Sequence, residues 1–112
     1  MKIGFIGLGS MATAMIGGML AKEMVKPEEI IGSSKTEATM EKIKTKFNIT
    51  TVPENKTVAE EADVLFLAVK PIFLGEVIEE IRASVRPQTL IVSIAAGRDL
   101  HYLKETFGRP EL

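Results

Sequence analysis

The chain has 112 residues, 46% of them hydrophobic and 26% charged, which suits one globular domain and excludes wholesale disorder. Its 14 basic and 15 acidic residues leave a net charge of −1, and no clustered basic face for nucleic acid is expected. The absence of cysteine excludes disulfides and thiolate catalysis. No apolar run approaches the ~20 residues of a membrane span, and early glycines interrupt any signal-peptide helix, so we expect a soluble, cytoplasmic domain.

Short apolar runs alternate with stretches of helical periodicity along the whole chain. The apolar runs predict buried strands at residues 3–6, 30–31, 49–52, 63–69 and 89–94. The other stretches predict helices at residues 11–20, 36–47 and 57–62, between Pro71 and Pro87, and at residues 100–107. This alternation indicates an α/β fold, with a doubly wound, mostly parallel sheet and helices on both faces, as one domain over residues 1–112.

Two sets of side chains have a plain structural interpretation. Met11, Met15 and Met19 recur every four residues along the first predicted helix, so we expect all three in the core. Glu79 and Glu80 are expected to lie on the solvated face of a later helix. His101 has no evident partner and is expected at the surface, and no cluster has the spacing of metal ligands.

A glycine motif joins the first predicted strand to the first predicted helix. Gly7–Leu8–Gly9–Ser10–Met11–Ala12 reads G-x-G-x-x-A, and its place between a strand and a helix is the context that dinucleotide binding requires. The first glycine permits the tight turn, the second lets a pyrophosphate approach, and the small Ala12 lets the helix lie against the strand. The motif predicts a Rossmann-type nucleotide site, and the alternative is a glycine-rich turn that binds nothing.

The second predicted strand ends without the carboxylate that would hold the ribose of NAD. Gly32–Ser33–Ser34–Lys35–Thr36 offers three hydroxyls and one ammonium group, which can donate hydrogen bonds to a 2′-phosphate. The sequence therefore favours NADP as the cofactor, with NADPH preferred over NADH. The alternative is a capped helix start with an exposed lysine.

Two later strands are expected to end at the same edge of the sheet, where ligands of open α/β sheets bind. The first ends at Lys70–Pro71, and the second continues into Ser93–Ile94–Ala95–Ala96–Gly97, whose small residues leave room for a flat ring. Taken alone, each segment is equally well explained as a turn.

The glycine motif, the segment from Asp63 to Pro71 and the Ala95–Ala96–Gly97 turn together resemble pyrroline-5-carboxylate reductase, in order and at similar spacing. That family reduces Δ1-pyrroline-5-carboxylate to proline with NAD(P)H. The chain departs from the family pattern at Ser10, where Asn or Gln is common, and at Arg98, where an apolar residue is usual.

The resemblance implies a set of cofactor-binding residues in this chain and assigns no catalytic residue. The pyrophosphate would lie along Ile6, Gly7, Leu8, Gly9, Ser10 and Met11. The adenosine half would meet Ser33, Ser34, Lys35 and Asn55, and the nicotinamide half would lie along Ala68, Val69, Lys70, Pro71 and Ala96.

In the family, a C-terminal helical domain supplies the substrate pocket and the dimer interface. We therefore interpret the chain as the cofactor-binding half of an enzyme that forms homo-oligomers, and expect it to be inactive alone. A β-hydroxyacid dehydrogenase has a similar glycine motif, but Val69–Lys70–Pro71 and Ala95–Ala96–Gly97 favour the reductase. A stand-alone nucleotide-sensing module is the alternative that is not an enzyme.

Overall fold

A computed structural model describes residues 1–94 of the chain, and strands and helices alternate through them. The elements are β1 (Ile3–Ile6), α1 (Ser10–Ala21), a short 3₁₀ helix (Pro27–Glu29), β2 (Ile30–Ser33), α2 (Glu37–Phe47), β3 (Thr50–Val52), α3 (Asn55–Glu61), β4 (Val64–Leu67), α4 (Pro71–Ile81) and β5 (Leu90–Ser93). Within these residues, no helix is long and apolar enough to cross a membrane.

The five strands form one parallel sheet in the order β3-β2-β1-β4-β5. The chain winds outward from β1 to β3, then crosses to the other side of β1 to form β4. The strand order therefore reverses between β1 and β4, which is where ligands of doubly wound sheets bind. The rings of Phe5 and Phe66 stack across this pair of strands, 4.9 Å apart, and hold the centre of the sheet together.

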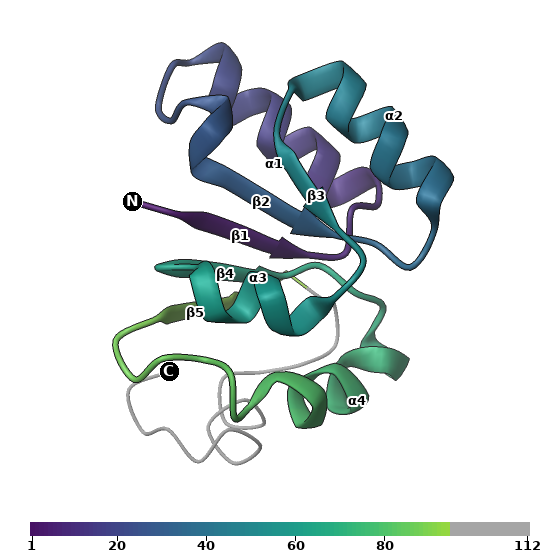
Figure 1. The fold of residues 1–112 in the computed structure, drawn as a ribbon, viewed down its shortest axis with the longest axis vertical. Coiled ribbons are helices and arrows are strands. Elements are labelled where there is room, and N and C mark those ends of the chain that lie inside the picture. The colour runs from purple at the N-terminus through teal and green to yellow at the C-terminus, as the bar shows by residue number, and fades with distance from the viewer. Residues whose placement is uncertain (95–112) are drawn as a thin grey trace.

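Two hydrophobic cores lie on opposite faces of the sheet because successive side chains of a strand point to opposite sides. On one face, Phe5 and Ile30 pack with the buried residues of α1 and α2, and on the other, Ile6 and Leu67 pack with those of α3 and α4 (Figure 1). Both faces are covered, so the sheet exposes its ends to solvent, and a binding site can form at one of them.

The predicted Rossmann-type fold is confirmed for the described residues, with strand and helix ends shifted by one or two positions, except that α4 ends at Ile81, well before Pro87. The predicted core position of Met11 is wrong, because this side chain is 60% exposed. It lies in the first turn of α1, beyond the end of β1, and the fully buried Ala12 and Ile16 face the sheet instead. Met15 and Met19 are partly buried against that core. The predicted helix at residues 100–107 lies outside the described residues.

A polar network at the amino end of the sheet ties β4 to its neighbours. The backbone N–H of Lys2 donates to one carboxylate oxygen of Asp63 at 2.8 Å, and the guanidinium of Arg86 donates to the other at 2.9 Å. Arg86 also donates to the carbonyl oxygen of Ala62. These donors, the Lys2 N–H above all, stabilise the charged carboxylate and hold the pKa of Asp63 below its ordinary value.

Because the pKa of Asp63 is lower in the folded chain, its contribution to stability is complete above the unfolded pKa of about 3.9 and is lost as the pH falls through the folded pKa. We expect Asp63→Asn to lower the unfolding temperature at neutral pH, and the gap to the wild type to close below about pH 4. Thermal unfolding followed by circular dichroism across this range checks the expectation. Glu60→Gln removes an exposed charge as the control, and a gap that stays constant with pH would contradict the assignment.

Candidate nucleotide-binding site

The carboxyl ends of the three central strands are tied together by backbone hydrogen bonds. The N–H of Gly7, just after β1, donates to the carbonyl of Ser33 at the end of β2 at 3.1 Å. On the other side, the N–H of Ala68, just after β4, donates to the carbonyl of Ile6 at 2.8 Å. The turn that leaves β1 is therefore held between β2 and β4 at the point where the strand order reverses.

Gly7 makes this turn with a φ of +97°, in a region that residues with a side chain rarely adopt. A Cβ atom at this position would collide with the carbonyl oxygen of Ala68. Both the backbone angle and the close approach of β4 therefore require glycine, as the motif predicts.

At position 9, neither the backbone angle nor a close approach of another strand requires glycine. It is the N-cap of α1 with a φ of −79°, and a Cβ atom there would meet nothing within 4 Å. The first N–H groups of α1 have no partner within their helix and carry its positive dipole end. Open space in front of such a helix end is what a phosphate group needs, so the vacant side of Gly9 fits a pyrophosphate.

A cavity of about 450 Å³ lies at this edge of the sheet. Ten of the residues predicted for the site line it, namely Ile6, Gly7, Gly9, Ser33, Ser34, Lys35, Asn55, Ala68, Val69 and Lys70. Thr36, one of the three hydroxyl residues noted at the end of β2, also lines it, and so do Phe73 and Val77, which sequence reasoning missed. Phe73 and Val77 are four residues apart in α4, so they lie on the same face of the helix. This spacing, counted from the helix start at Lys70–Pro71, is the signal that could have found them.

The charge of the cavity favours an anion. Lys35 and Lys70 bring two ammonium groups to its rim, and no Asp or Glu is among its lining residues. The hydroxyl oxygen of Ser34 accepts the Thr36 N–H at 3.2 Å, which leaves the Ser34 hydroxyl hydrogen available to a ligand. The β2 end of the cavity can therefore both attract a phosphate and donate a hydrogen bond to it.

Asn55 joins the cavity to the helix behind it. Its side-chain oxygen accepts the hydroxyl hydrogen of the fully buried Ser33 at 2.6 Å, and its amide nitrogen donates to a carboxylate oxygen of Glu80 at 2.9 Å. The prediction that Glu80 lies on a solvated helix face is confirmed, but the sequence did not indicate its bond to Asn55. Glu80 is exposed, but α4 passes close enough to the start of α3 for its carboxylate to bind Asn55.

The remaining predicted residues lie elsewhere. Leu8 packs into the core beneath α1 and α2, so only its backbone can face a ligand at the turn. Ser10 and Met11 are in the first turn of α1, Pro71 is in the first turn of α4, and none of the three lines the cavity, while Ala96 lies outside the described residues. Within residues 1–94, no group of His, Cys, Asp and Glu could hold a metal ion.

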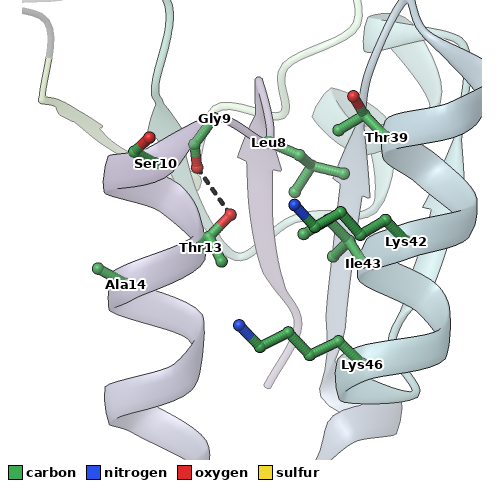
Figure 2. A pocket seen from close by; sticks show the side chains of 9 residues that line it. All are labelled: Leu8, Gly9, Ser10, Thr13, Ala14, Thr39, Lys42, Ile43 and Lys46. Carbon is green, nitrogen blue, oxygen red and sulfur yellow. Dashed lines mark hydrogen bonds between the residues drawn. The ribbon is translucent and has the colours of Figure 1, made fainter.

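A second hollow of about 530 Å³ lies between α1 and α2. Figure 2 shows Lys42 and Lys46 extending from α2 toward α1, and Thr13 donating a hydrogen bond to the carbonyl of Gly9 at 2.7 Å. The hollow is slightly larger than the carboxyl-edge cavity, but it lies along the helix flanks and away from β4. The cavity at the strand ends, where the strand order reverses, is therefore the stronger candidate for a nucleotide site.

Comparison with known proteins agrees with this geometry. The family described as NADP oxidoreductase, coenzyme F420-dependent, matches residues 2–97. The chain belongs to this family. It is 37% identical over 107 residues to the pyrroline-5-carboxylate reductase of Escherichia coli. This alignment covers 96% of this chain and 40% of that enzyme. The predicted resemblance to these reductases, in their N-terminal part, is thus confirmed.

Solved structures show the same likeness. The pyrroline-5-carboxylate reductase of Coxiella burnetii superposes with a TM-score of 0.89 at 30% identity, over 96% of this chain and 40% of that one. The Plasmodium falciparum pyrroline carboxylate reductase, solved with NADP bound, superposes with a TM-score of 0.79 at 28% identity, over 97% of this chain and 38% of that one. A 3-hydroxyisobutyrate dehydrogenase of Mycobacterium tuberculosis, at 20% identity and a TM-score of 0.76, shares the fold alone, so the dehydrogenase alternative is not favoured. The chain spans about 40% of the length of these reductases.

The two motif glycines should respond differently to alanine. In Gly7→Ala the new methyl collides with the Ala68 carbonyl, and alanine is strained at the positive φ. We therefore expect a loss of about 2 kcal/mol or more in the free energy of unfolding. Gly9→Ala places its methyl in open space at an ordinary φ, and we expect a smaller loss of about 0.5–1 kcal/mol, because alanine is a poorer N-cap than glycine. Urea unfolding of both variants measures this, and equal losses would contradict the description of the turn.

Proposed function

We propose that this chain is the nucleotide-binding part of a pyrroline-5-carboxylate reductase, an NADPH-dependent enzyme that reduces Δ1-pyrroline-5-carboxylate to proline. The observation that supports this most strongly is the carboxyl-edge cavity at the reversal of strand order, with its open helix end and two ammonium groups. The 37% identity to a reductase of this name over 96% of the chain supports the choice of reaction.

Each part of the cavity has a role in this proposal. The backbone N–H groups at the start of α1 bind the pyrophosphate beside Gly9, while Ser34, Lys35 and Asn55 hold the adenosine half. The nicotinamide half lies along Ala68, Val69 and Lys70, and Ala96 is proposed to complete this side. When bound, the cofactor supplies the hydride that reduces the C=N bond, and this chain binds and orients it.

The substrate pocket and the homo-oligomer interface are proposed to belong to a further helical domain. This is supported by the fraction of the reductases that the chain spans, about 40%. The described cavity carries groups for a nucleotide, and none of its lining residues is a carboxylic acid or histidine that could protonate the substrate nitrogen. We also propose a cytoplasmic site of action, with no nucleic-acid or membrane partner.

We expect the 112-residue chain to bind NADPH but not to turn over Δ1-pyrroline-5-carboxylate. Gly9→Val should abolish the binding because its branched side chain fills the space in front of α1, while the poorer N-cap lowers the unfolding temperature by only a few degrees. Calorimetric titration, thermal unfolding and an absorbance assay of NADPH oxidation provide the three measurements.

The outcomes separate the parts of the proposal. A wild-type chain that binds no NADPH would contradict the nucleotide site. Steady turnover by the chain alone would contradict the placement of the substrate pocket in a further domain. Unchanged affinity in Gly9→Val would mean that the glycine turn is only structural.

Cofactor preference follows from the β2 end of the cavity. Ser34 and Lys35 can meet a 2′-phosphate, and no carboxylate among the lining residues is placed to accept the ribose 2′-hydroxyl of NADH. A well-formed hydrogen bond to a charged group contributes roughly 1.5–3 kcal/mol, and exposure to solvent reduces this. We therefore propose that NADPH binds about tenfold more tightly than NADH, a difference of about 1.4 kcal/mol.

Ser34→Asp should reverse this preference, because the new carboxylate repels the 2′-phosphate and accepts the ribose hydroxyl. High salt should weaken the wild-type preference, since Lys35 is exposed and its charge is screened. Competitive binding of NADPH and NADH at low and high salt measures both effects. Ser84→Asp, which adds the same charge beyond the far end of α4, is the control. Equal affinities in the wild type, or the same ratio in Ser34→Asp, would refute the assignment.

A further inference from the structure

A chain of hydrogen bonds runs beside the carboxyl-edge cavity from the buried end of β2 to the surface of α4. Ser33, which is fully buried, bonds to Asn55, which is 8% exposed, and Asn55 bonds to the exposed Glu80. The three residues come from β2, α3 and α4, and two of them, Ser33 and Asn55, line the cavity. The sequence alone gave no reason to link Glu80 with the other two.

The chemistry of Glu80 determines the direction of every bond in this chain. A carboxylate can only accept hydrogen bonds, so the amide of Asn55 must turn its NH₂ group toward Glu80. The side-chain oxygen of Asn55 then faces inward, and the Ser33 hydroxyl must donate to it. Without an acceptor at position 80, the amide could turn over and Ser33 could accept instead of donate.

This direction changes what the cavity offers to a nucleotide. The hydroxyl hydrogen of Ser33 is used inside the protein, so Ser33 cannot donate to a phosphate, contrary to the expectation from the sequence. That role remains with Ser34 and Lys35. The NH₂ group of Asn55 has a second hydrogen beyond the one that Glu80 accepts, and because Asn55 lines the cavity, this hydrogen can be offered to a nucleotide.

We propose that Glu80 is a positioning residue, which holds the Asn55 amide with its N–H side toward the nucleotide, so that Asn55 donates to an acceptor oxygen of the adenosine half. The oxygen belongs to either the ribose or its 2′-phosphate, because both accept an N–H. The proposal rests on the proposed function, since it needs a nucleotide in the cavity. Glu80 touches no ligand itself and acts through Asn55.

Glu80→Lys tests the proposal because a lysine can only donate, and a donor at position 80 turns the Asn55 carbonyl outward. That carbonyl would repel an acceptor oxygen, so we expect NADPH affinity to fall about tenfold relative to Glu79→Lys. Glu79→Lys is the matched control, since it adds the same charge on the neighbouring residue, whose carboxylate bonds to Arg82 on the exposed side of α4. The added positive charge alone would strengthen NADPH binding, which is the opposite result.

Three further measurements distinguish positioning from general disruption. Glu80→Gln keeps an acceptor in its amide oxygen and should bind within about twofold of the wild type. Glu80→Lys should unfold within about 2 °C of Glu79→Lys, because both are exposed positions. In an Asn55→Ala background, Glu80→Lys should have no more effect than Glu79→Lys, because its effect passes through Asn55.

Parallel titrations with NADPH and NADH identify the oxygen. Loss for both cofactors supports the proposal with a ribose oxygen as the partner, and loss for NADPH alone supports it with the 2′-phosphate. Equal affinities in Glu80→Lys and Glu79→Lys overturn the positioning role while leaving the proposed function intact. A wild-type chain that binds neither cofactor overturns both.

Discussion

The turn at Gly7 is the constraint on which the rest of the site depends. β1 is the central strand, so the chain that leaves it must pass between β2 and β4, whose ends are bonded to it on either side. Only a residue without a Cβ fits beneath the Ala68 carbonyl at a φ of +97°. This turn sends α1 back across one face of the sheet and leaves its N-cap, Gly9, in the wall of the cavity.

The polar groups around this turn divide into those already bonded within the protein and those available to a ligand. Ser33 donates its hydroxyl hydrogen to Asn55, so it serves the scaffold. Ser34 keeps its hydrogen while accepting from Thr36, and Lys35 brings a charge, so these two remain available to a ligand. The two adjacent serines therefore differ in what they can offer, because Ser33 is buried and bonded to an Asn55 amide whose N–H side faces Glu80 on α4.

The fold and most of the residues that line the cavity could be predicted from the sequence, because they depend on local patterns. A few neighbouring residues suffice to recognise strand and helix periodicity, the two motif glycines and the stop at Lys70–Pro71. The carboxyl ends of parallel strands then meet at one edge of the sheet. The exposure of Met11 could not be predicted, because helical spacing does not say where the sheet ends. The Asn55–Glu80 bond links residues 25 apart on two helices, and only their packing brings them together.

Backbone amide shifts of the isotope-labelled chain during a titration with NADPH test the central claim most directly, because they report each position separately. The account predicts that the largest changes fall on Gly7, Gly9, Ser34, Lys35 and Val69 around the carboxyl-edge cavity. Smaller changes are expected for Thr39, Lys42 and Lys46, which line the hollow between α1 and α2. The largest changes along that hollow, with the strand ends unaffected, would contradict the account.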